Sequence, residues 1–222
     1  MNTVILNKAY GDLPFCEREI LRYAGCKSAD SETEKLLKVC LNEADGKLNY
    51  KVCYRLFPVS VHEDMCDFGA FSLKSYMLSQ NLKSCDEVII FAATVGVGID
   101  RLISKYGRLS PSKALMFQAI GAERIETLCD FFCEDIKNEL NKQIMPRFSP
   151  GYGDLPLEIQ KNIFSVLDCE KRIGLTLNDS LLMSPSKSVT AFVGISNDGK
   201  IKRQNKCAAC DKKDCNFRRE NS

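Results

Sequence analysis

Apolar residues recur along the chain at two spacings, one typical of helices and one typical of strands. The longest helical pattern runs from about 112 to 140. It follows Ser110 and Pro111, an N-cap residue and a proline suited to the first helical position. Shorter stretches with apolar residues every three or four positions predict further amphipathic helices. These stretches are 13–23, 31–44, 67–80, 99–106 and 156–172.

Strand-like segments occur between the helical ones. Apolar and polar residues alternate at 48–61, with an interruption at Pro58, and again at 180–183 and 188–195. Residues 88–95 are continuously apolar, which predicts a strand that is buried on both faces. Because strands and helices do not alternate strictly, the pattern predicts an α+β fold with a mainly antiparallel, twisted sheet and flanking helices.

Composition excludes several classes of partner. The 222 residues carry a formal net charge of +2, so no basic field favours a nucleic acid. No apolar run reaches the roughly 18–20 residues of a membrane helix. Residues 1–12 lack the basic and apolar regions of a signal peptide. We therefore expect a cytoplasmic protein without nucleic-acid or membrane partners. Its single histidine, His62, excludes a metal site built from several histidines.

Twelve cysteines in a cytoplasmic chain indicate thiols or metal ligands rather than disulfides. Cys207, Cys210 and Cys215 have the spacing C-x2-C-x4-C, which can wrap around one iron–sulfur cluster or one zinc ion. A fourth ligand is not evident nearby, so free thiols or a redox pair remain the alternative. An iron–sulfur cluster here could pass an electron to a partner.

The segment 147–154 (RFSPGYGD) has the chemistry of a ligand-binding loop. Arg147 supplies a permanent planar cation that can grip a carboxylate through two hydrogen bonds. Gly151 allows a ligand to approach the backbone closely, and Tyr152 offers a flat ring with a polar tip. Together they predict a pocket for a small zwitterion with an aromatic part. The alternative is a connecting loop whose prolines and glycines only make a turn.

Arg147-x-x-x-Gly151-Tyr152 resembles the S-adenosylmethionine-binding signature of the cobalamin-dependent methionine synthase activation domain family, in a short, stand-alone form. The similarity continues at Ser188-Val189, which enters a strand, and upstream at Glu126 on the long helix. It covers about residues 88–196. The resemblance implies that 87–202 form an S-adenosylmethionine-binding core. Residues 1–86 would be a helical and strand region of the same fold, and 203–222 a cysteine-rich tail.

The resemblance also implies roles for individual residues. Arg147 would bind the methionyl carboxylate, and backbone groups of Ser149 and Gly151 would hold the adenosine or methionyl part. Tyr152 would lie beside the methyl group where a corrin arrives. Glu126 would face the cationic side of the ligand, and its alternative is a solvated residue on a helix surface.

The function implied is that of an activation subunit, which supports reductive methylation of cob(II)alamin on a separate cobalamin-dependent methionine synthase. The cobalamin-binding motif Asp-x-His-x-x-Gly is absent from the sequence, so the cobalamin is expected on a partner. A flavodoxin or ferredoxin would donate the electron. Whether the chain is itself an enzyme stays open. A reactivator of another corrinoid methyltransferase, or a non-catalytic module that senses S-adenosylmethionine, remains the alternative.

A pair of glycines outside this loop has two possible interpretations. Gly96 and Gly98 follow the apolar strand 88–95 and precede a helix, as glycines do in a dinucleotide-binding turn. The third glycine of that fingerprint is replaced by Arg101, and no repeat of strand, helix and strand surrounds it. The pattern therefore favours a turn that is needed for packing.

Overall fold

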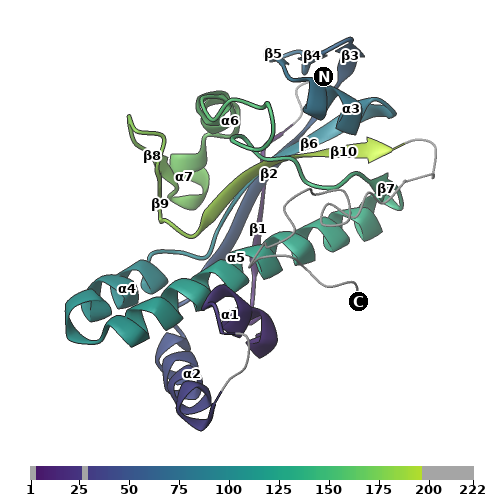
Figure 1. Cartoon of the computed structure of the whole chain (residues 1–222). Helices are drawn as coiled ribbons and strands as arrows, with labels where there is room; N and C mark the ends of the chain where they lie inside the picture. The colour runs from purple at the N-terminus through teal and green to yellow at the C-terminus, as the bar shows by residue number, and fades with distance from the viewer. Residues whose placement is uncertain (1–3, 27–29, 197–222) are drawn as a thin grey trace.

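A computed structural model describes residues 4–26 and 30–196 of the chain. Figure 1 shows a curved central sheet with the long helix α5 (Pro111–Leu140) crossing one face. The sheet has the strand order β1-β2-β6-β10-β7, and each neighbouring pair is antiparallel. This architecture confirms the predicted α+β class with an antiparallel sheet and flanking helices.

The five strands of the main sheet come from distant parts of the chain. They are β1 (Leu6–Tyr10), β2 (Tyr50–Pro58), β6 (Cys85–Thr94), β7 (Gln143–Ile144) and β10 (Ser188–Ser196). β6 is the central strand and lies between β2 and β10. Because β2 pairs with β6 over eight residues, the region 1–86 and the region that follows it share one sheet.

One face of the sheet packs against helices around α5. These helices are α1 (Glu17–Tyr23), α2 (Ser31–Ala44) and α4 (Gly98–Leu109). Alternate side chains of each strand point toward this layer, as the pleat requires. Phe132 of α5 contacts Tyr54 of β2 and Phe91 of β6, with ring centroids 5.2 and 4.9 Å apart. These contacts tie the centre of α5 to the middle of the sheet.

The opposite face carries shorter elements. They are β3 (Ser60–His62), β4 (Met65–Asp67), β5 (Ser72–Lys74), α3 (Tyr76–Leu82), α6 (Ile159–Leu167), α7 (Cys169–Ile173), β8 (Thr176–Leu177) and β9 (Met183–Ser184). Phe68, after β4, stacks on Phe192 of β10 at 5.2 Å. The sheet is therefore covered on both faces, which explains the continuously apolar sequence of β6.

The structure corrects several boundaries. The helix predicted at 67–80 is wrong over its first half, where β4 and β5 form a hairpin and Gly69 adopts a φ of +75°. The actual helix α3 begins only after Ser75, whose hydroxyl caps Leu78 N. The predicted helix 156–172 is interrupted at Asp168, which has a φ of +51°. The sequence pattern misses β1, because most of its side chains are exposed and it has no apolar alternation.

The Gly96–Gly98 turn is explained by packing. A Cβ at Gly98 would collide with the backbone carbonyl oxygen of Lys47, whereas a Cβ at Gly107 in the same helix would meet nothing within 4 Å. We expect Gly98→Ala to lower the free energy of unfolding by about 1–3 kcal/mol, because the backbone must shift. Gly107→Ala is the matched control and should raise it by about 0.5–1 kcal/mol. Urea unfolding checks both, and equal effects would contradict this explanation.

Candidate functional site

The loop that holds the predicted site lies along the edge of β10. Phe148 and Phe192 exchange two backbone hydrogen bonds, each 2.9 Å long, and Met145 N donates to Gly194 O at 2.7 Å. The Phe148 side chain is buried. Because the N–H and C=O of Phe148 are both bonded to Phe192, the neighbouring Arg147 and Ser149 are held close to β10.

Arg147 is paired with two carboxylates of α5. Its Nη2 lies 3.1 Å from Glu126 Oε2 and 2.6 Å from Asp130 Oδ1. The Arg147 side chain is only 19% exposed. Burial acts to lower the pKa of Arg147, but the neighbouring Cys129 thiol and the two carboxylates act in the opposite direction, so the pKa lies above its usual value. The guanidinium is therefore a permanent charge in a defined position.

The structure thus places Glu126 beside Arg147, two residues that the resemblance assigns to one ligand, and adds Asp130 to them. Sequence reasoning missed Asp130, although its position four residues after Glu126 places it on the same helix face. One cation flanked by two carboxylates can bind a zwitterion: the arginine attracts a carboxylate, and the acidic groups attract an ammonium or another cation.

Two cysteines of α5 lie beside this cluster. Burial raises the pKa of Cys129 to about 12 and that of Cys133 to about 11, although the charge of Arg147 acts in the opposite direction. Both thiols therefore stay protonated near neutral pH. They do not act as nucleophiles or thiolate ligands under these conditions.

Tyr152 stands between two glycines with positive φ, Gly151 at +83° and Gly153 at +59°. A Cβ at Gly151 would lie 3.2 Å from Leu157 Cδ1, and one at Gly153 would collide with Met77 Sδ. The positive φ angles favour glycine at both positions, whereas the atoms in these contacts belong to the ends of flexible side chains. The Tyr152 ring meets Phe148 edge-on at 5.3 Å and is 46% exposed.

Some backbone groups of the loop are already hydrogen-bonded within the loop, and others are not. Ser149 O accepts from Tyr152 N at 3.1 Å, and Gly151 N donates to Leu155 O at 2.9 Å, so these two groups already have partners. Backbone binding of a ligand at the predicted residues would therefore use Ser149 N–H and Gly151 C=O.

The strand edge next to the loop is a feature that the sequence did not reveal. Because Phe192 N and O face the loop, the alternation of antiparallel strands directs the backbone of Thr190 and Ser188 to the same edge. β6 pairs with the other edge of β10, and in the described ranges no strand pairs with this loop-side edge at these two positions. The Thr190 hydroxyl is buried and has no hydrogen-bond partner there. The backbone N–H and C=O groups along this open edge are candidates for hydrogen bonds with a polar ligand.

The predicted metal ligands Cys207, Cys210 and Cys215 lie outside the described residues. Within 4–26 and 30–196, no group of three or more histidine, cysteine or acidic side chains is placed to hold a metal ion. The same ranges contain no helix that combines the length and the apolar character needed to cross a bilayer.

Fold and site together define an α+β domain that carries a charged candidate ligand loop on the edge of an antiparallel sheet. A family model described as the activation domain of vitamin B12 dependent methionine synthase matches residues 60–216, and the chain belongs to this family. The match confirms the resemblance seen in the sequence.

A solved structure described as the MetH reactivation domain bound to AdoHcy is similar to this chain. The TM-score is 0.66 at 16% sequence identity, and the match covers 89% of this chain and 80% of that chain. At this identity the likeness shows that the two share a fold.

Proposed function

We propose that this chain binds S-adenosylmethionine in the Arg147 loop and supports reductive methylation of cob(II)alamin on a separate cobalamin-dependent methionine synthase. The observation that carries the proposal is the cluster of Arg147, Glu126 and Asp130, formed by the signature loop in a member of the activation-domain family. A flavodoxin or ferredoxin would supply the electron. The nine free thiols of the described residues suit the reducing cytoplasm, where we place the protein.

The cluster fits the amino-acid end of the ligand. Arg147 would take the methionyl carboxylate, a charge-assisted interaction. Glu126 and Asp130 would then face the ammonium and sulfonium charges, so each carboxylate keeps a cationic partner when the ligand arrives. This exchange of partners leaves no buried charge uncompensated, which is the condition for binding a zwitterion in a half-buried site.

The strand edge fits the remainder of the ligand. The outward-facing backbone groups of Thr190, together with Ser149 N–H and Gly151 C=O, offer donors and acceptors for the adenosine part. Tyr152 would flank the methyl group at the exposed end of the loop. The similar reactivation domain is bound to AdoHcy, the demethylated form of the same ligand, which supports this choice of ligand class.

The residues of this chain bind and orient rather than exchange protons. S-Adenosylmethionine supplies the methyl group, and the partner's cobalamin accepts it together with one electron, which yields methylcobalamin and S-adenosylhomocysteine. Holding the donor in one orientation converts an encounter of two molecules into a transfer within one complex. His62 lies exposed on β3, on the small sheet, and has no part in the site.

Single-turnover reactivation tests the proposal. A methionine synthase loaded with cob(II)alamin is mixed with S-adenosylmethionine and a chemical reductant, and methylcobalamin is followed by its absorbance. We expect methylcobalamin to form only when this chain is present. Equal formation without the chain would contradict the proposal. Binding of S-adenosylmethionine with no reactivation would instead favour the sensing module. A different corrinoid methyltransferase is tested in parallel. Reactivation of that enzyme and not of methionine synthase would favour the alternative that the chain serves another corrinoid methyltransferase.

A further inference from the structure

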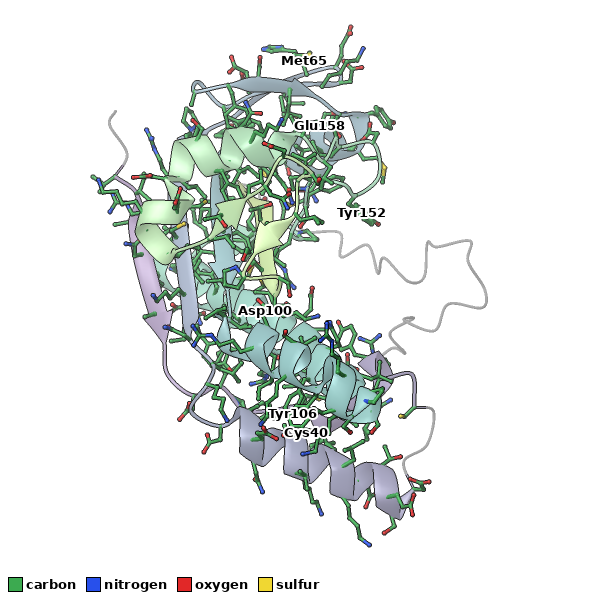
Figure 2. All side chains as sticks on the ribbon, turned by 90° about the vertical axis from the view of Figure 1, so that its left-hand side faces the viewer. Cys40, Met65, Asp100, Tyr106, Tyr152 and Glu158 are labelled. Atoms are coloured by element: carbon green, nitrogen blue, oxygen red, sulfur yellow. The ribbon has the colours of Figure 1, made fainter. Side chains whose placement is uncertain are left out.

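The ligand loop 147–154 is attached to the rest of the fold on two sides. Near its start, Phe148 is bonded to β10. At its end, Asp154 is bonded to the first turn of α3, an element from a distant part of the chain. Tyr152 lies between these two attachments, and Figure 2 shows it projecting outward from its loop. The segment that carries Tyr152 is therefore a short connection between β10 and α3.

Asp154 uses both oxygens of its carboxylate to hold α3. Oδ1 accepts from Ser75 Oγ at 2.6 Å and from Met77 N at 3.2 Å, and Oδ2 accepts from Tyr76 N at 2.7 Å. The two backbone N–H groups belong to the first turn of the helix, which offers them no acceptor of its own. These bonds, of which that from Ser75 is the largest cause, lower the pKa of Asp154, so its carboxylate stays charged near neutral pH.

α3 contacts the loop at its other end as well. Asn81 Nδ2 donates to Pro146 O at 3.3 Å, and Pro146 directly precedes Arg147. Ser75 joins the Asp154 contact to the helix itself, because its buried hydroxyl donates to Asp154 and accepts from Leu78 N at 3.1 Å. The helix thus holds the chain on both sides of the segment that contains Arg147 and Tyr152.

We propose that Asp154 is a positioning residue, through which α3 holds the ligand loop in the conformation that binds S-adenosylmethionine. The inference rests on the proposed function and adds to it a residue whose carboxylate is already bonded to α3. Gly151 and Gly153 give the loop backbone conformational freedom, so without this anchor fewer molecules present Arg147 and Tyr152 together. The observed affinity falls in proportion to the fraction of molecules in the binding conformation.

Calorimetric titration of the full chain with S-adenosylmethionine compares Asp154→Ala with a matched control. Asp67→Ala also removes an exposed carboxylate that accepts a backbone hydrogen bond, but that bond is local, from Gly69 N at 2.9 Å. We expect Asp154→Ala to bind about tenfold more weakly and Asp67→Ala to bind like the wild type. Asp154→Asn keeps one acceptor oxygen and should fall between them, and it carries the same comparison if Asp154→Ala does not fold.

Ser75→Ala removes the hydroxyl that Asp154 contacts and tests the same link from the side of α3. It should also weaken binding of S-adenosylmethionine. The double variant Ser75→Ala/Asp154→Ala should lose less than the two single losses combined, because both changes break one hydrogen bond. Additive losses would mean that the two residues act independently, which contradicts the proposed link.

Amide hydrogen exchange separates positioning from a general loss of stability. Tyr152 N and Leu155 N are bonded within the loop at 3.1 Å each. Without ligand, Asp154→Ala should speed exchange at these two amides and leave exchange in α5 unchanged. In the wild type, S-adenosylmethionine should slow exchange at Tyr76 and Met77, because coupling between two sites is reciprocal. In Asp154→Ala this effect of the ligand on α3 should disappear.

Wild-type affinity in both Asp154 variants would overturn the inference. Equal losses in Asp154→Ala and Asp67→Ala would also overturn it, since the loss would then follow net charge. Faster exchange throughout α5 in Asp154→Ala would do the same, because it would indicate destabilisation of the whole fold. The proposed function would fail differently, through a wild-type chain that binds no S-adenosylmethionine.

Discussion

Arg147→Ala will lower the affinity for S-adenosylmethionine at least about a hundredfold, which corresponds to roughly 2.7 kcal/mol. The variant loses the group proposed to bind the methionyl carboxylate, and charge-assisted hydrogen bonds contribute about 1.5–3 kcal/mol each. It also leaves Glu126 and Asp130 without the cation that lies 3.1 and 2.6 Å away. The incoming carboxylate would then face two negative charges, so the loss should exceed that of one hydrogen bond. Isothermal titration calorimetry measures it.

Two variants sharpen the interpretation. Arg101→Ala removes an exposed arginine of α4 and should bind the ligand like the wild type, which controls for the change in net charge. Arg147→Lys keeps the charge without the planar fork and should recover only part of the affinity. Wild-type affinity in Arg147→Ala would show that the carboxylate binds elsewhere, and the strand edge at Thr190 would become the candidate.

The residues of the candidate ligand loop could be picked out from the sequence because their pattern is local. Arg147, Gly151 and Tyr152 lie close together in the chain, and the structure places them on one loop fixed to β10. The long helix α5 could also be predicted from the sequence, because its helical spacing of apolar residues extends over 30 residues. Local signals of this kind do not depend on how the rest of the chain folds.

Features that join distant segments could not be predicted. The bond from Ser75 to Asp154 spans 79 residues, and nothing in either segment indicates the other. The open edge at Thr190 depends on which side of β10 the loop occupies. β1 pairs with β2 at the border of the sheet, where none of its side chains is fully buried, so it lacks the apolar alternation of a strand with one buried face.

Glu123 and Arg124 are the clearest case of tertiary structure overriding a sequence expectation. Adjacent charged residues on a helix usually lie in solvent, yet Arg124 is fully buried and Glu123 is 2% exposed. Arg124 donates to Leu13 O at 2.8 Å and to Pro14 O at 2.7 Å, in addition to its bonds with Glu123. The pair therefore satisfies backbone carbonyls of the segment that leads into α1, and the sequence holds no sign of this.

Arg124→Met will lower the free energy of unfolding by about 3–5 kcal/mol, because it leaves the buried Glu123 carboxylate without its cation. It also leaves the carbonyl oxygens of Leu13 and Pro14 without their hydrogen-bond donor, and each unsatisfied group lowers the free energy of unfolding further. Arg101→Ala again serves as the control and should change stability by less than about 0.5 kcal/mol. Urea unfolding measures the free energy of unfolding of both variants. A loss below about 1 kcal/mol would mean that the segment 12–16 rearranges to find other partners, and α1 would then not depend on the pair.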